Sequence, residues 1–114
     1  GKQEKAPLPS MTVRIDRLVN LEGSRVRAAA SVNLAGAFAI HGLKVVDSEK
    51  GLFVSMPQNR YEKEGRTQYS DICHPITAQA RAALSEAVLA AYEQRLEEEE
   101  GADFAELPNA WQTM

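Results

Sequence analysis

The segment RVRAAASVNLAGAFAIHGLKVVD, residues 25–47, decides the fold that this sequence predicts. Its first half alternates apolar residues with Arg25, Arg27, Ser31 and Asn33; the apolar ones are Val26, Ala28, Ala30, Val32 and Leu34. Strict alternation predicts a strand with one packed face and one face in water. Ala35-Gly36 predicts a turn. A second strand then runs from Phe38 to Val46, and its alternation slips at His41-Gly42, where glycine can mark a bulge.

Further strands flank this hairpin. Upstream, Val13 and Ile15 alternate with charged residues, and residues 21–24 read as a turn. Downstream, GLFVSMP, residues 51–57, predicts a short buried strand. Residues 69–73 predict a fifth strand. Because the connections are short, neighbouring strands should pair in sequence order.

The chain then changes its period. Thr77 is a candidate helix N-cap, and Leu84, Val88 and Tyr92 lie on one helical stripe. We expect a helix over residues 78–100, ended by Gly101. The predicted fold class is α+β, an antiparallel sheet of four to five strands followed by one long C-terminal helix. One sheet leaves an edge strand open, which favours a homodimer.

Length and composition predict one domain. The chain has 114 residues, 44% hydrophobic and 25% charged, as is typical of globular proteins. We expect a disordered leader over residues 1–10, the folded domain over 11–100, and a tail over 101–114. Three apolar residues of the tail can form a short helix: Phe104, Leu107 and Trp111. No secretion signal or membrane-spanning run is visible, and the single cysteine suits a reducing compartment, so we expect a cytoplasmic protein that does not act in a membrane.

The net charge of −3 conceals a basic body and an acidic end. Seven of the 16 acidic residues lie between Glu93 and Glu106, together with one of the 13 basic residues, Arg95. The rest of the chain therefore has 12 basic residues against 9 acidic ones. A mildly basic body can bind a polyanion locally.

Catalytic and metal-binding patterns are weak. Cys73 and His74 are adjacent, but neighbouring side chains of a strand point to opposite faces. We therefore expect Cys73 to be a small core residue and His74 to be structural. Two histidines and one cysteine, without ligand spacing, do not predict a metal site. No glycine-rich phosphate loop occurs. We expect no enzyme activity, no cofactor and no small-molecule substrate; a bound metal or an exposed, reactive Cys73 would reopen the enzyme hypothesis.

The remaining candidates are basic residues near the middle of the chain. Arg60, Lys63 and Arg66 lie in a polar stretch between GLFVSMP and DICHPI, residues 71–76, and Arg81 lies in the first turns of the helix. On charge alone, ordinary surface solubility is the better explanation of such residues.

The order of these segments resembles the SpoVG family of septation and sporulation regulators. The resemblance rests on GLFVSMP, the basic loop, DICHPI, a helix with Arg81 and AVL (87–89), and upstream VRIDRLVN (13–20). It covers about residues 11–96. It implies small bacterial proteins that dimerise, bind DNA and in some members RNA, regulate septation, sporulation or gene expression, and have neither enzyme activity nor cofactor. It implies contacts at Arg60 and Arg81, to which we add Lys63 and Arg66.

Three positions depart from the family pattern. A lysine is usual where this chain has Asn59, an arginine where it has Ser70, and a basic residue where it has Ala83. Binding driven by phosphate neutralisation weakens with each lost cation. The alternative hypothesis is therefore a protein-interaction module of the same fold, with weakened nucleic-acid binding and Phe104, Leu107 and Trp111 facing the partner.

Overall fold

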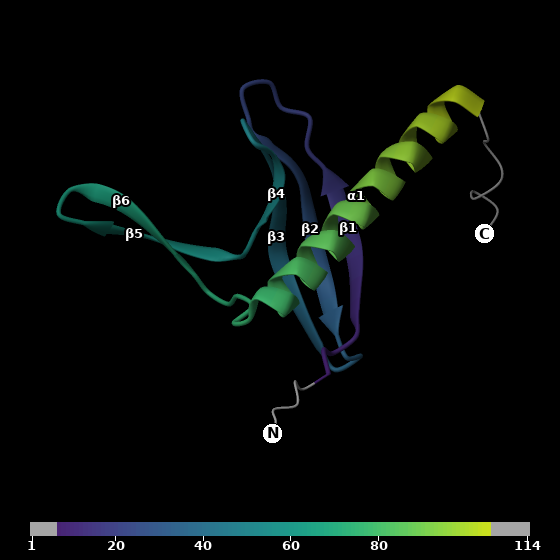
Figure 1. Cartoon of the computed structure of the whole chain (residues 1–114). Coiled ribbons are helices and arrows are strands. Elements are labelled where there is room, and N and C mark those ends of the chain that lie inside the picture. The colour runs from purple at the N-terminus through teal and green to yellow at the C-terminus, as the bar shows by residue number, and fades with distance from the viewer. Residues whose placement is uncertain (1–6, 106–114) are drawn as a thin grey trace.

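The chain folds into a four-stranded sheet, a separate two-stranded sheet and one long helix (Figure 1). The structure is a computed structural model that describes residues 7–105, with the backbone only for residues 100–105. Its elements are β1 (Met11–Leu18), β2 (Val26–Leu34), β3 (Phe38–Ser48), β4 (Gly51–Ser55), β5 (Gln58–Lys63), β6 (Arg66–Asp71) and α1 (Ala78–Ala105). The larger sheet is antiparallel in the order β1-β2-β3-β4. The predicted α+β class and sequence-order pairing are confirmed.

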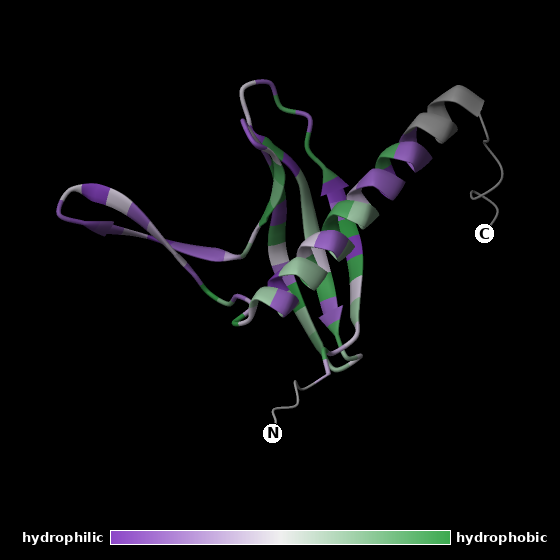
Figure 2. Ribbon diagram, viewed as in Figure 1, coloured by the Kyte–Doolittle hydropathy of each residue, from purple (hydrophilic) through white to green (hydrophobic). Residues whose placement is uncertain are grey.

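The core lies between one face of this sheet and α1, which crosses it diagonally (Figures 1 and 2). The predicted helical stripe is confirmed, because Leu84, Val88 and Tyr92 are all buried. They pack with sheet residues at alternating positions: Ile15, Ala28, Ala30, Val32, Leu43 and Val45. Burying each large aliphatic side chain contributes about 1.5–3 kcal/mol, which makes this interface the main source of stability.

Local signals in the sequence are satisfied as expected. The Oγ1 of Thr77 accepts a hydrogen bond from the Ala80 amide at 3.0 Å, so Thr77 caps the helix. Ala35 and Gly36 have φ of 58° and 70° and form the tight turn between β2 and β3. The pairing of β2 with β3 shifts between Ala30 and Ser31, opposite Gly42, whose φ is 90°. The predicted bulge is therefore confirmed.

The predicted basic loop was wrong, and the fifth strand predicted over residues 69–73 overlaps β6 but lies outside the larger sheet. Residues 58–71 form an antiparallel hairpin, β5 paired with β6, around a turn at Glu64 and Gly65 with φ of 53° and 76°. The hairpin, which we call the arm, projects away from the larger sheet (Figure 1). All but one of its strand residues are exposed, so neither face carries the apolar alternation that reveals a strand in a sequence.

Three smaller expectations also failed. The strand β4 was predicted to be buried, but it is the edge of its sheet, and Leu52 and Phe53 are 39% and 46% exposed. A register shift between Val26 and Ala28 takes Val26 out of the predicted apolar face. The helix continues through Gly101 to Ala105, because a glycine costs a helix only about 1 kcal/mol and does not end it alone.

The predicted leader and tail lie partly outside the described residues. The structure does not describe residues 1–6 and 106–114, and the second range includes Leu107 and Trp111. Within the leader, the carbonyl of Ser10 accepts a hydrogen bond from the Ala35 amide at 2.8 Å.

Candidate nucleic-acid interface

The arm divides the predicted basic residues between its two faces. Directly paired residues of an antiparallel hairpin share a face, and the face alternates along each strand. Arg60 pairs with Tyr69, whereas Lys63 pairs with Arg66 one residue from the turn. Arg60 therefore lies on one face of the arm, and Lys63 and Arg66 lie on the other, at its tip.

The distance along the arm separates these residues further. A strand advances about 3.4 Å per residue, so Arg60 lies about 10 Å from the base at Pro57 and Lys63 about 20 Å from it. The base itself is closed by the Ile72 amide, which donates to the Pro57 carbonyl at 2.7 Å. Arg60 therefore lies nearer the base of the arm than Lys63 and Arg66 do.

Arg81 lies at the start of α1, one turn into the helix. Its side chain is exposed, and Nη2 lies 3.4 Å from the carbonyl oxygen of Pro75. Its amide donates to the Thr77 carbonyl at 3.0 Å. The first turn of α1 contains no acidic residue, so the partial positive charge of the helix N-terminus adds to that of Arg81. This end of the helix is electrostatically suited to an anion.

The segment between the arm and α1 acts as scaffold. Cys73 is half-buried and packs against the core, as predicted. His74 is exposed, and its Nδ1 lies 3.0 Å from the Pro75 carbonyl oxygen. Asp71 accepts a hydrogen bond from Gln58 Nε2 at 2.9 Å.

Two of the departures from the family pattern face each other. Asn59 and Ser70 are directly paired across the arm, on the face that carries Lys63 and Arg66. Where the resemblance implies two cations, this chain has a neutral pair. Ala83, the third departure, is half-buried in α1.

Sequence reasoning missed a polar network on the sheet. The Oγ of Ser31, 5% exposed, donates to Asp16 Oδ2 at 2.6 Å and lies 2.8 Å from His41 Nδ1. Asp16 also accepts from Arg14 Nε at 2.8 Å. The hydrogen bond from Ser31 lowers the pKa of the Asp16 carboxyl, and Arg14 lowers it further, although partial burial opposes both. The one sequence signal was a serine where β2 is otherwise rich in alanine.

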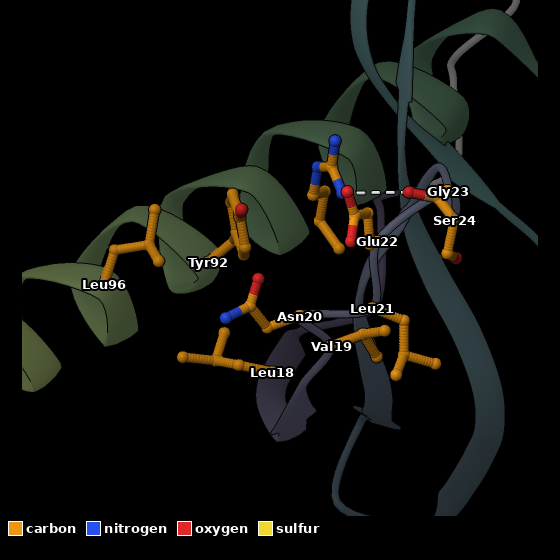
Figure 3. A pocket seen from close by; sticks show the side chains of 10 residues that line it. Leu18, Val19, Asn20, Leu21, Glu22, Gly23, Ser24, Tyr92 and Leu96 are labelled. Atoms are coloured by element: carbon orange, nitrogen blue, oxygen red, sulfur yellow. Dashed lines mark hydrogen bonds between the residues drawn. The ribbon is translucent and has the colours of Figure 1, made fainter.

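A cleft beside the helix offers few groups for chemistry. It measures about 800 Å³ and lies between the β1–β2 connection and α1, lined by Leu18, Tyr92, Leu96 and Arg27 among others (Figure 3). Arg27 is engaged there by the Ser24 carbonyl at 3.0 Å. Across residues 7–105, no three histidine, cysteine or acidic side chains gather as metal ligands. In the same part of the chain, no helix is both long and apolar enough to cross a membrane.

Comparison with known proteins bears on this geometry. The SpoVG family profile matches residues 9–94. A protein of Heliobacterium modesticaldum named as a septation protein SpoVG is 51% identical over 80 residues, covering 70% of this chain and 85% of its own. A protein of the same name from Desulforudis audaxviator is 45% identical over 83 residues, which cover 73% of this chain and 89% of the relative. A relative named SpoVG 1 from Listeria monocytogenes is 46% identical over 77 residues, covering 68% and 72%.

These matches span both sheets and most of the helix, including the arm and Arg81. The chain belongs to the SpoVG family.

Proposed function

We propose that this protein is a cytoplasmic, homodimeric, non-enzymatic regulator that binds DNA, and also RNA, and acts in septation, sporulation and gene regulation. The septation role is supported by the names of its relatives. The observation that carries nucleic-acid binding is the exposure of two cations, Arg60 in the half of the arm nearer its base and Arg81 in the first turns of α1. Lys63 and Arg66 add positive charge at the tip of the arm.

Two features of the fold support dimerisation. An isolated two-stranded hairpin is only marginally stable in water, and the arm is almost wholly exposed. The described chain also has a radius of gyration of 17.1 Å. A compact chain of this length would have about 13 Å, so the arm extends to where a second copy can pack against it.

The open edge of the larger sheet also supports dimerisation. The strand β4 pairs with β3 on one side only, and its residue Leu52 is 39% exposed. Open edges are commonly covered in oligomers. A dimer would also duplicate Arg60 and Arg81, which raises the number of cations facing one nucleic acid.

Salt-dependent binding tests the nucleic-acid assignment. We expect the Arg60→Ala/Arg81→Ala variant to bind duplex DNA more weakly and to lose about two units of salt slope, one for each phosphate contact. Lys50→Ala, which removes an exposed cation in the β3–β4 turn, is the matched control and should change binding little. Equal affinity and slope in wild type and double variant would remove Arg60 and Arg81 from the interface.

Light scattering tests the dimer separately. We expect twice the 12.5 kDa chain mass at micromolar concentration. A monomer mass would contradict the proposal that the arm and the β4 edge are covered by a second copy.

The neutral Asn59–Ser70 pair favours the second candidate, a protein-interaction module. In that case Phe104, Leu107 and Trp111 would contact the partner. Removing residues 101–114 should then abolish partner capture. If a partner captured by the full chain is still bound by the shortened chain, this second candidate fails.

A further inference from the structure

The sheet face opposite α1 carries two rows of polar side chains. One row, across β1, β2 and β3, consists of the directly paired residues Arg14, Ser31 and His41. The other row consists of Arg17, Ala29 and Lys44. Directly paired residues share a face. The intervening row, Ile15, Ala30 and Leu43, is buried under the helix, so these two rows face away from it.

This face has the form of a shallow trough. Its floor on β2 consists of the short side chains of Ala29 and Ser31. Its rims carry long ones: Arg14 and Arg17 on β1, and His41 and Lys44 on β3. Strands lie about 4.8 Å apart, so the two rims are separated by about 10 Å. One sugar–phosphate strand can enter such a trough, and a duplex cannot.

The trough is positively charged. The four-stranded sheet contains two acidic residues, Asp16 and Asp47. Asp16 pairs with Arg14 at 2.8 Å, and Asp47 with Arg27 at 3.3 Å. Among the side chains of residues 7–99, Arg17 and Lys44 have no ion-pair partner, and both are exposed on the rims. Their charges are therefore available to an anion.

Two bulges shape the middle of the trough. The register of β1 shifts between Ile15 and Arg17, which adds Asp16 to the face, and Gly42 produces the shift beside His41. Both side chains then meet at the Ser31 hydroxyl. Bulges commonly re-aim side chains next to functional sites. The network keeps the Asp16 carboxylate hydrogen-bonded to Arg14 and Ser31.

One end of the same face offers an aromatic ring. Phe53 pairs with Val46, and Ser55 pairs with Lys44 one row away on the same face. Phe53 is 46% exposed although it is a large apolar residue. Grooves that bind single-stranded nucleic acids combine cations along the backbone with aromatic rings on which bases stack.

We propose that this trough binds the backbone of a single-stranded nucleic acid along β2, with Arg17 and Lys44 contacting phosphates and Phe53 stacking on a base. The inference rests on the proposed nucleic-acid binding and adds a surface on the other side of the sheet from Arg81. The arm and helix start then take one segment of nucleic acid, and the trough takes an unpaired strand.

The test compares Arg17→Gln/Lys44→Gln with wild type, with the control Lys50→Gln and with Arg60→Ala/Arg81→Ala. The probes are a labelled 20-nucleotide oligothymidine and a 20-base-pair duplex, measured by fluorescence anisotropy against salt. For the oligothymidine we expect roughly tenfold weaker binding of Arg17→Gln/Lys44→Gln at 0.1 M salt, with a salt slope shallower by about 1.4 units. Lys50→Gln should match wild type, and duplex binding should respond to Arg60→Ala/Arg81→Ala instead.

The outcomes separate the two proposals. If Arg17→Gln/Lys44→Gln binds oligothymidine as tightly as wild type does, the trough proposal is overturned and the proposed function stands. The same holds if this variant loses equal affinity for the duplex and for the single strand. A wild type that binds neither probe overturns both. If the double variant does not fold, an NMR titration of the wild type decides: amide shifts at Ala29, Ser31 and Lys44 support the trough, and their absence on saturation rejects it.

Discussion

The guanidinium of Arg95 in α1 donates from Nη1 to the carbonyl oxygen of Ile15 in β1, at 3.0 Å and across 80 residues of sequence. Ile15 is the last residue before the pairing of β1 with β2 shifts register. A helix side chain thus satisfies a strand carbonyl at a bulge and sets how the end of α1 lies over β1. The same guanidinium pairs with Glu99 at 3.4 Å on the surface.

Replacing Arg95 should therefore destabilise the fold more than a surface charge would. We expect Arg95→Met, which keeps an apolar stem, to lower the free energy of unfolding by about 1–2 kcal/mol, because a partly buried carbonyl loses a charged donor. Urea denaturation measures the change. Glu99→Gln removes only the exposed ion pair and should cost less than about 0.5 kcal/mol. Equal effects of the two variants would show that the Ile15 contact contributes nothing.

The Asp16–Ser31 hydrogen bond predicts a specific response to acid. Because the folded state lowers the pKa of Asp16, its contribution to stability is present above the unfolded pKa and is lost as pH falls through the folded one. We expect wild-type stability to decline below about pH 4, where free aspartate begins to protonate. In Asp16→Asn that part of the decline should be missing when unfolding is followed from pH 6 to pH 2. Parallel curves for the two proteins would contradict this assignment.

Gly42 is the residue that the β3 bulge requires. Its φ of 90° lies in a region that side chains avoid, and a Cβ placed there would lie 3.6 Å from the Cβ of Pro57. Because that distance is ordinary contact, the penalty comes from the backbone. We expect Gly42→Ala to destabilise the protein by about 1–2 kcal/mol in thermal unfolding. Gly42→Asn should be milder, since asparagine tolerates positive φ; an identical loss for both would point to packing instead.

The neutral pair on the arm allows a gain of function. Asn59→Lys/Ser70→Arg places two cations on the face that carries Lys63 and Arg66. We expect tighter DNA binding and a salt slope steeper by about two units, with a stability cost below about 1 kcal/mol from the facing like charges. The neutral variant Asn59→Gln/Ser70→Asn controls for side-chain size. No change in slope would mean that this face of the arm does not meet phosphates.

Where the sequence predicted well, the signal was local and repeated. The alternation in β2 and β3, the Ala35-Gly36 turn, the glycine bulge and the Thr77 cap each arise from side chains within a few residues of one another. The buried stripe of Leu84, Val88 and Tyr92 follows from helical period alone. Arg60 and Arg81 came from the family resemblance of the local motif, and their contacts with nucleic acid stay a prediction.

The prediction failed where a strand lacked alternating apolar and polar residues, or where burial depended on strands distant in the sequence. The arm is exposed on both faces, so only its turn could have revealed the hairpin in the sequence. That turn has Glu64 at a positive φ, where glutamate is uncommon. GLFVSMP is apolar enough for a central strand, yet β4 has a neighbour on one side only.

By itself, the sequence determined the element types, the core stripe, the turns and the family, because periodicity and turn chemistry act over short separations. Only the tertiary structure decided which cations share a surface. Strand alternation places Arg60 on the opposite face of the arm from Lys63 and Arg66. Arg17 and Lys44 lie far apart in the chain, but both pair with Ala29 and so share one face of the larger sheet. Strand register, shifted by single-residue bulges, sets these neighbours, and a shift of one residue moves a side chain to the opposite face.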